Sequence, residues 1–146
     1  MNVPELIVAG LVLFSPVLVT EPENKNDSVE CLALNMYHEA RGQGSAGLLG
    51  VSSVVLNRVR DKRFPNTICK VIYQGPTRES WKTRQTPDPS DAVFYPVRDR
   101  CQFSWYCDGK SDEPKEKKVY QRLLTIARSI VYNNISFIDI TDGATH

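Results

Sequence analysis

The stretch "VECLALNMYHEARGQGSAGLLGVSSVVLNRVR", residues 29–60, contains two apolar patterns separated by glycines. In the first pattern, apolar residues recur every three or four positions and so form one face of a helix, which Gly42 and Gly44 end. The second pattern predicts another helix from about Ser45 to Arg60. The inner faces carry Val29, Leu32, Ala33, Met36, Tyr37 and Ala40 in the first helix, and Leu48, Val51, Ser52, Val55, Leu56 and Val59 in the second.

The flanking sequence completes a mainly helical chain. Residues 23–28, "ENKNDS", are expected to be a polar linker, with Asp27 and Glu30 spaced like a capping box. A short helix is predicted in residues 68–74 and a long helix after Pro114, ending at the asparagines 133–134. The proline-rich residues 75–114 predict a long structured loop region with a small hairpin around "CQFSWYC", residues 101–107, and the tail 135–146 is β-leaning. The expected fold class is α+β, predominantly helical, in a single domain.

Composition narrows the class of protein. The 146 residues are 41% hydrophobic and 24% charged, which suits one globular domain. Residues 1–24 contain three glutamates and no Lys or Arg, so the rest of the chain carries 18 basic and 14 acidic residues. This mild excess favours an anionic polymer as partner. Nucleic-acid binding is not predicted, because the sequence contains no run of alternating basic and aromatic residues and no known nucleic-acid-binding fingerprint.

Residues 1–24 are expected to be a signal peptide or signal anchor. Residues 6–19, "LIVAGLVLFSPVLV", are uncharged, and their length fits a signal-peptide hydrophobic region better than a full membrane span. The alternative is a buried N-terminal helix or strand. The export reading predicts a protein of the periplasm or cell envelope, with transient membrane association through this segment. The chain is expected to act as a monomer.

Four cysteines, Cys31, Cys69, Cys101 and Cys107, allow three complete pairings. Export would favour disulfides, and Cys101 and Cys107 are near enough in sequence to close one loop. A zinc site would need closely paired ligands, but the close pair here is C-x5-C, and the chain has only two histidines. The sequence therefore predicts structural cysteines, no metal and no cofactor.

The dipeptide His38-Glu39 could belong to a metal site, to a catalytic acid or to an ordinary surface. A zinc-protease helix needs H-E-x-x-H, and Gly42 stands where the second histidine should be. On a helical wheel Glu39 lies at the edge of the apolar face beside Asn35, while His38 is expected to face solvent. Partial burial would raise the pKa of the Glu39 carboxyl, and a carboxylic acid that keeps its proton is what glycosidic bond cleavage requires. The alternative is a surface glutamate paired with Arg41 or Arg58.

Five segments, in order, resemble the SleB-type cell-wall hydrolases, the family of the spore cortex-lytic enzyme. They are the "EARG" core, "VVLNRV", "FPNTICKVIYQ", "CQFSWYCDG" and "DITDGATH", and the resemblance as a whole begins at Cys31 and covers residues 31–146. The resemblance implies a lysozyme-like fold, peptidoglycan glycan strands as the substrate, and Glu39 as the catalytic glutamate. Residues 25–146 would then be the catalytic domain. Many members continue E-A-R-G with Glu, where this chain has Gln43.

The resemblance and the absence of a convincing second carboxylate favour a lytic transglycosylase acting between N-acetylmuramic acid and N-acetylglucosamine. A true muramidase would need a partner such as Asp99, Asp108 or Asp112. A peptidoglycan-binding module without turnover is the alternative from another class, and an amidase lacks its usual metal or Cys–His pair. The side chains expected to hold the glycan are Gln102, Ser104, Trp105, Tyr106 and Asn57, with Tyr73 or Tyr95 beside the developing positive charge.

Overall fold

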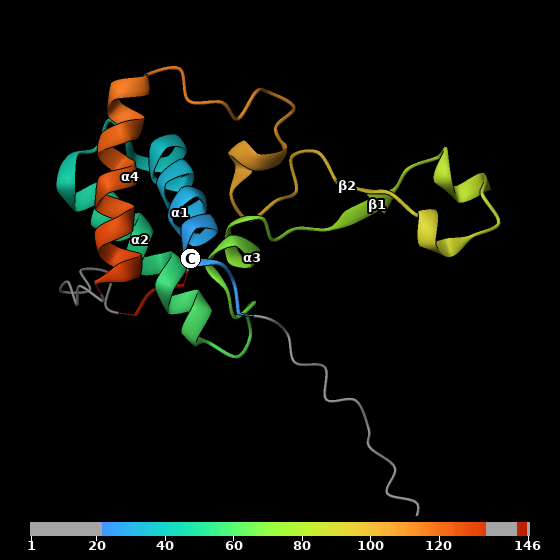
Figure 1. Ribbon diagram of the computed structural model, residues 1–146, viewed down its shortest axis with the longest axis horizontal. Helices are drawn as coiled ribbons and strands as arrows, with labels where there is room; N and C mark the ends of the chain where they lie inside the picture. Colours follow the sequence, from blue (N-terminus) through green and yellow to red (C-terminus); the bar gives the residue numbers. More distant parts are fainter. Residues whose placement is uncertain (1–21, 134–142, 146) are drawn as a thin grey trace, which may run out of the picture.

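The computed structural model describes residues 22–133 and 143–145 (Figure 1). Residues 1–21 of the predicted leader, which spans residues 1–24, and most of the tail lie outside these residues. Within them, the long helices are α1 (Lys25–Ala40), α2 (Gly44–Arg60) and α4 (Lys117–Tyr132), and α3 (Ile68–Ile72) is a short one. No helix in this part of the chain is both long and apolar enough to cross a bilayer.

Helix α1 is the centre of the fold. It packs against α2, α3 and α4, and Leu32, Ala33 and Met36 on its apolar face are fully buried. Burying a Leu or Met side chain stabilises a fold by about 1.5–3 kcal/mol, so these residues anchor the core. The partners across the interface include Val55 of α2, Val71 and Ile72 of α3, and Leu123 and Ala127 of α4. The α+β, predominantly helical class is confirmed, whereas the lysozyme-like topology stays a prediction.

The start of α1 differs from the prediction. The helix begins at Lys25, inside the expected linker, and Asn24 is the N-cap, its side-chain oxygen accepting a hydrogen bond from the Asn26 amide at 2.9 Å. Asn and Asp are equally good N-caps, so the sequence offered two starts. The earlier one brings Glu23 to the body, where its carboxylate accepts a hydrogen bond from the Cys69 amide at 3.0 Å. The capping box at Asp27 was therefore wrong.

The hairpin predicted around residues 101–107 was also wrong. Ser104–Cys107 form a 3₁₀ helix, η3. Phe103, Trp105 and Cys107 alternate in sequence as on a strand, and all three are buried. The disulfide between Cys101 and Cys107, with Cα atoms 6.1 Å apart, curls the segment onto the core instead of letting it extend.

The two-stranded sheet lies elsewhere, in residues 76–97, which we call the arm. Strands β1 (Thr77–Glu79) and β2 (Phe94–Pro96) pair antiparallel, with Arg78 opposite Tyr95. Two 3₁₀ turns, η1 (Thr83–Gln85) and η2 (Pro89–Asp91), form its tip. Figure 1 shows the arm projecting away from the helices. At its base, a Cβ on Gly75 would lie 3.0 Å from the Cys101 Cα, so this close approach favours glycine.

The two disulfides join Cys31 to Cys69 and Cys101 to Cys107. The first ties α1 to α3, and the second closes the loop that carries Trp105. This selects one of the three pairings that the sequence allowed.

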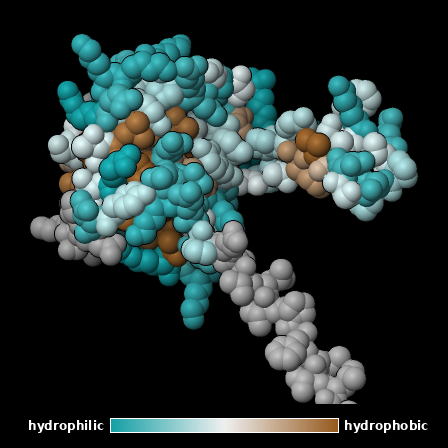
Figure 2. Space-filling view, in the orientation of Figure 1, coloured by the Kyte–Doolittle hydropathy of each residue, from teal (hydrophilic) through white to brown (hydrophobic). Residues whose placement is uncertain are grey.

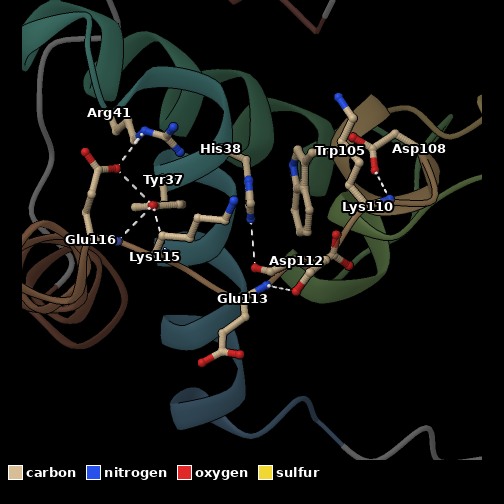
Figure 3. Close-up of a pocket in the computed structure, with 11 residues that line it drawn as sticks. Tyr37, His38, Arg41, Trp105, Asp108, Lys110, Asp112, Glu113, Lys115 and Glu116 are labelled. Carbon is tan, nitrogen blue, oxygen red and sulfur yellow. Dashed lines mark hydrogen bonds and ion pairs between the residues drawn. The ribbon is translucent and has the colours of Figure 1, made fainter.

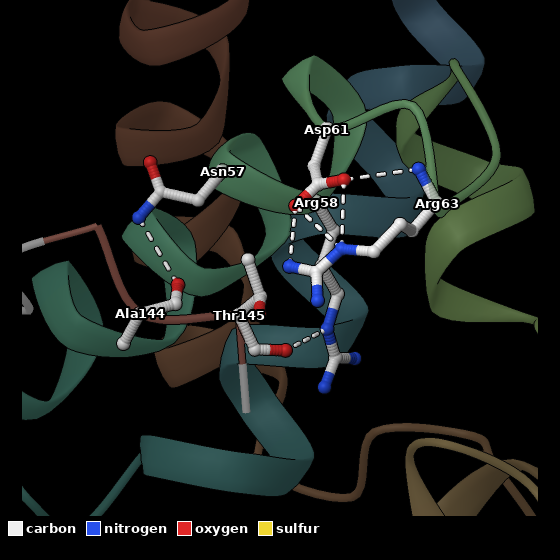
Figure 4. Close-up of polar contacts among 6 residues, drawn as sticks. All are labelled: Asn57, Arg58, Asp61, Arg63, Ala144 and Thr145. Atoms are coloured by element: carbon white, nitrogen blue, oxygen red, sulfur yellow. Dashed lines mark hydrogen bonds and ion pairs between the residues drawn. The ribbon is translucent and has the colours of Figure 1, made fainter.

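The last described residues lie against α2 (Figure 4). The Asn57 side-chain amide donates to the Ala144 carbonyl at 3.1 Å, and Arg58 Nε donates to the Thr145 carbonyl. The Arg58 guanidinium also lies over the Phe103 ring, 5.3 Å from its centroid. Residues 144 and 145 are thereby attached to the same helix that packs on α1.

Candidate active site

Glu39 lies in the last turn of α1, one residue before the helix ends at Ala40. Its side chain is half-buried, and within the described residues its carboxylate has no hydrogen-bond or ion-pair partner. Burial raises the pKa of the Glu39 carboxyl, while the neighbouring His38 acts to lower it. Neither Arg41 nor Arg58 pairs with it: Arg41 pairs with Glu116 at 3.0 Å, and Arg58 bonds Thr145.

Next to Glu39, the α1 helix is joined to the disulfide loop through Trp105. The buried indole donates from Nε1 to Asn35 Oδ1 at 2.9 Å and stacks on the His38 ring, with centroids 4.6 Å apart and planes 15° from parallel. His38 Nε2 is 2.9 Å from the Asp112 carbonyl oxygen (Figure 3). His38 is therefore not the solvent-facing residue that the helical wheel predicted, because residues 105–112 cover its face of the helix.

Figure 3 shows a cavity beside this stack, about 510 Å³ in volume. Tyr37, His38 and Trp105 form its aromatic wall. The Tyr37 hydroxyl donates to Glu116 at 2.9 Å and accepts from the Lys115 amide at 3.1 Å, which fixes one edge. The rest of the lining is charged except for Ser111 and comes mainly from residues 108–116. Glu39 does not line this cavity, so the helix end presents two separate features: the cavity and the half-buried carboxyl.

The residues expected to hold a glycan are not equally placed. Tyr73, at the end of α3, is half-buried, with its ring centroid 6.1 Å from that of Trp105 and 4.6 Å from that of Tyr106. Burial, reinforced by Tyr106 and by more distant acidic and phenolic groups, raises the pKa of the Tyr73 hydroxyl. Tyr73, Trp105 and Tyr106 thus form one aromatic group beside α1.

Gln102 and Ser104 are both exposed, and the Gln102 backbone amide donates to the Gln74 carbonyl at 2.9 Å. Their side chains are therefore available to a ligand. Trp105 itself is mostly core: only 7% of it is exposed, and one ring face is covered by His38. The Asn57 side chain is bonded to the Ala144 carbonyl, and Tyr95 lies in strand β2 of the arm, so neither belongs to the aromatic group beside α1.

Sequence reasoning named Asp112 only as one of three possible partner carboxylates and missed that its segment covers His38. Burial raises the pKa of the Asp112 carboxyl, partly opposed by His38 and reinforced by Asp108. The only signal was the dense charge of "DGKSDEPKEKK", residues 108–118, which is also typical of a solvated loop. No three His, Cys, Asp or Glu side chains of the described residues are grouped so as to hold a metal.

The comparison with known families decides the assignment. The sequence model of the family described as cell wall hydrolase matches residues 42–146, most of the chain. The chain belongs to the cell wall hydrolase family. The match begins three residues after Glu39, so the family assignment rests on α2 and everything after it.

The cell wall hydrolase assignment agrees with similarity to three proteins named spore cortex-lytic enzyme. One from Bacillus subtilis is 37% identical over 49 residues, covering 34% of this chain and 16% of that protein. One from Bacillus cereus is 39% identical over 51 residues, covering 35% and 19%. One from Oceanobacillus iheyensis is 36% identical over 58 residues, covering 40% and 21%. The shared stretch is therefore a small part of each relative. No solved structure matches the chain.

Proposed function

We propose that this chain cleaves peptidoglycan glycan strands between N-acetylmuramic acid and N-acetylglucosamine, with Glu39 as the only catalytic carboxyl. The observation that carries the proposal is the state of Glu39: half-buried, without a described partner, and with a pKa raised by burial. A carboxyl with a raised pKa keeps its proton closer to neutral pH than an exposed glutamate does, so it is available as a general acid. Membership of the cell wall hydrolase family supports this substrate class.

The reaction needs one group to act twice. Glu39 first protonates the glycosidic oxygen, and the bond between this oxygen and the muramic acid anomeric carbon breaks. The C6 hydroxyl of the same sugar then forms a bond to that carbon, and its proton returns to Glu39. The products are a free N-acetylglucosamine hydroxyl and a 1,6-anhydromuramoyl end. No water is consumed, so no second carboxylate is required.

A hydrolytic muramidase is the second candidate, and Asp112 is the carboxylate that favours it. It lies in the segment that covers His38, the residue adjacent to Glu39. A muramidase would need this partner ionised, as nucleophile or as general base. Burial shifts the pKa of Asp112 upward, away from that requirement, which is why we prefer the one-carboxylate reaction.

For substrate binding, we propose that Gln102 and Ser104 donate and accept hydrogen bonds with sugar hydroxyls and acetamides. Tyr73 would present aromatic surface beside them, Trp105 would support the Tyr73 ring from the core, and Asn57 would support the adjacent residues 144 and 145. We further propose that residues 25–146 are the catalytic domain and that residues 1–24 direct export. The two disulfides support an oxidising location such as the periplasm or cell envelope.

The proposal is tested by replacing Glu39 with glutamine and measuring release of soluble muropeptides from purified sacculi. We expect the rate to fall by at least about 10²-fold, the usual contribution of general acid–base catalysis, with an unchanged circular dichroism spectrum. Asp112→Asn is the matched comparison and should retain most activity if one carboxylate suffices. Mass spectrometry of the products separates the two candidates, because an anhydro end is lighter than a reducing end by one water. Near-parental release by folded Glu39→Gln protein would refute the assignment.

A further inference from the structure

The arm carries an exposed groove that the proposed reaction does not use. It has a volume of about 390 Å³ and is lined by Arg78, Trp81, Lys82, Arg84 and Tyr95, with Glu79, Ser80 and Pro96. Trp81 is 62% exposed and Tyr95 59%. Figure 2 shows this arm standing clear of the helical body. Two large aromatic side chains exposed on one groove can serve as a binding surface.

These aromatics do not stabilise a core. No residue of the arm, residues 76–97, is buried. An exposed Trp and Tyr on a two-stranded ribbon contribute little to folding, because such a ribbon buries almost no apolar area. Their position therefore calls for a ligand rather than for packing.

The strand register places two of the lining residues on one face of the ribbon. Arg78 lies opposite Tyr95 in the β1–β2 pair, so both side chains project from the same face of the ribbon. Phe94, the residue before Tyr95, is equally exposed at 59% but projects from the other face and does not line the groove. The arm thus presents two matched aromatic residues, one inside the groove and one outside it.

The charge in the groove is positive and unpaired. Arg78, Lys82 and Arg84 form no ion pair with any described residue. The one carboxylate, Glu79, accepts a hydrogen bond from Thr83 at 3.3 Å. Lys82 Nζ lies 5.9 Å from the Trp81 ring centroid, so one cation stands directly beside an aromatic face. The groove therefore suits a ligand with flat apolar faces and carboxylates.

We propose that the arm groove is a second binding site for peptidoglycan, taking a muramic acid residue of the strand with its carboxylate-bearing lactyl or peptide substituent. This rests on the proposed function for its choice of substrate. The axial C–H bonds of a sugar ring would lie on the Trp81 and Tyr95 ring faces, because these faces carry partial negative charge and attract the slightly positive hydrogens. Arg78, Lys82 and Arg84 would bind the carboxylate, which a neutral glycan lacks. The arm site would bind the wall polymer at a point separate from Glu39. This attachment would keep the polymer near the protein and so raise the local concentration of cleavable bonds around Glu39.

The test measures binding separately from cleavage. Glu39→Gln protein, alone and with a second substitution in the arm, is sedimented with purified sacculi. We expect Trp81→Ala and Tyr95→Ala each to weaken binding by roughly tenfold, and Phe94→Ala, the matched control, to change it by less than about twofold. In solution, peptide-bearing glycan strands should bind more tightly than chitin oligosaccharides of equal length. Arg84→Gln should reduce that preference. Amidase-treated strands, which retain only the lactyl carboxylate, identify which carboxylate is bound.

Three results would overturn the proposal. The first is unchanged binding by both groove variants, and the second is an equal loss with Phe94→Ala. The third is tighter binding to vesicles of phosphatidylcholine and phosphatidylglycerol than to sacculi, which would make the arm a membrane contact. Failure of the proposed function is recognised separately. If Glu39→Gln protein still released muropeptides, the comparison among arm variants, made before the sacculi dissolve, would remain valid.

Discussion

Removing each disulfide in turn should reveal how differently the two crosslinks stabilise the fold. The Cys31–Cys69 bond closes a loop with a sequence separation of 38, and the Cys101–Cys107 bond one of 6. In the chain-entropy model, the longer loop constrains the unfolded chain by about 3.9 kcal/mol and the shorter by about 2.2 kcal/mol at 25 °C. The double substitution Cys31→Ala/Cys69→Ala should therefore cost about 1.6 kcal/mol more than Cys101→Ala/Cys107→Ala.

The two pairs are well matched for this comparison. Each contains one buried cysteine, Cys31 at 7% exposure and Cys107 at 6%, and one half-buried cysteine. The loss of packed sulfur is thus similar and largely cancels in the difference. The loops do not overlap in sequence, so their effects on the unfolded chain should add.

The assay is urea denaturation followed by tryptophan fluorescence, with free energies of unfolding extrapolated to water. Muropeptide release at a temperature where both variants stay folded gives the second readout. The short loop carries Trp105 and is expected to affect release more than its stability cost suggests. An equal loss of stability in the two variants, or a larger loss for the short loop, would refute the entropic reasoning.

Two further predictions concern the helix end. Because burial raises the pKa of Glu39 and the reaction needs its protonated form, kcat/KM should fall as pH rises through that raised pKa. A pH–rate profile with a second, ascending limb would instead indicate a hydrolase with two carboxylates. Trp105→Phe removes the hydrogen-bond donor to Asn35 Oδ1. Because Asn35 Nδ2 is already buried without a partner in the described residues, the whole amide would then be unsatisfied, and the free energy of unfolding in urea titrations should fall by about 2–3 kcal/mol. Tyr106→Phe is its control, since no described residue bonds the Tyr106 hydroxyl, and should change stability by less than about 0.5 kcal/mol.

The helices could be predicted because their signals are local. The spacing of apolar residues in 29–60 predicted α1 and α2 to within a few residues, and Pro114 and the asparagines 133–134 predicted the limits of α4. The partial burial of Glu39 also followed from the helical wheel, since the apolar stripe fixes which face meets the core.

The errors arose where distant segments meet. His38 points away from the apolar stripe, and only contact with Trp105 and Asp112, more than sixty residues later, takes it out of solvent. The segment 101–107 was predicted as a small hairpin because a short sequence window contains no information about the disulfide that closes it. The arm was predicted only as loop, since its three-residue strands are too short to produce a pattern.

A lone half-buried carboxyl is not a stable feature by itself, and the surrounding attachments explain how it persists. The folded-state pKa of Glu39 is raised above its unfolded value, so its ionised form is disfavoured in the fold. Any stabilisation from this group is present below the unfolded pKa and is lost as pH rises through the folded pKa. At neutral pH the helix end must therefore be held by other contacts. The disulfide at Cys31, the Trp105–Asn35 hydrogen bond and the Tyr37–Glu116 hydrogen bond attach α1 to α3, to the disulfide loop and to the N-cap residue of α4, so the helix that carries Glu39 is fixed at three points.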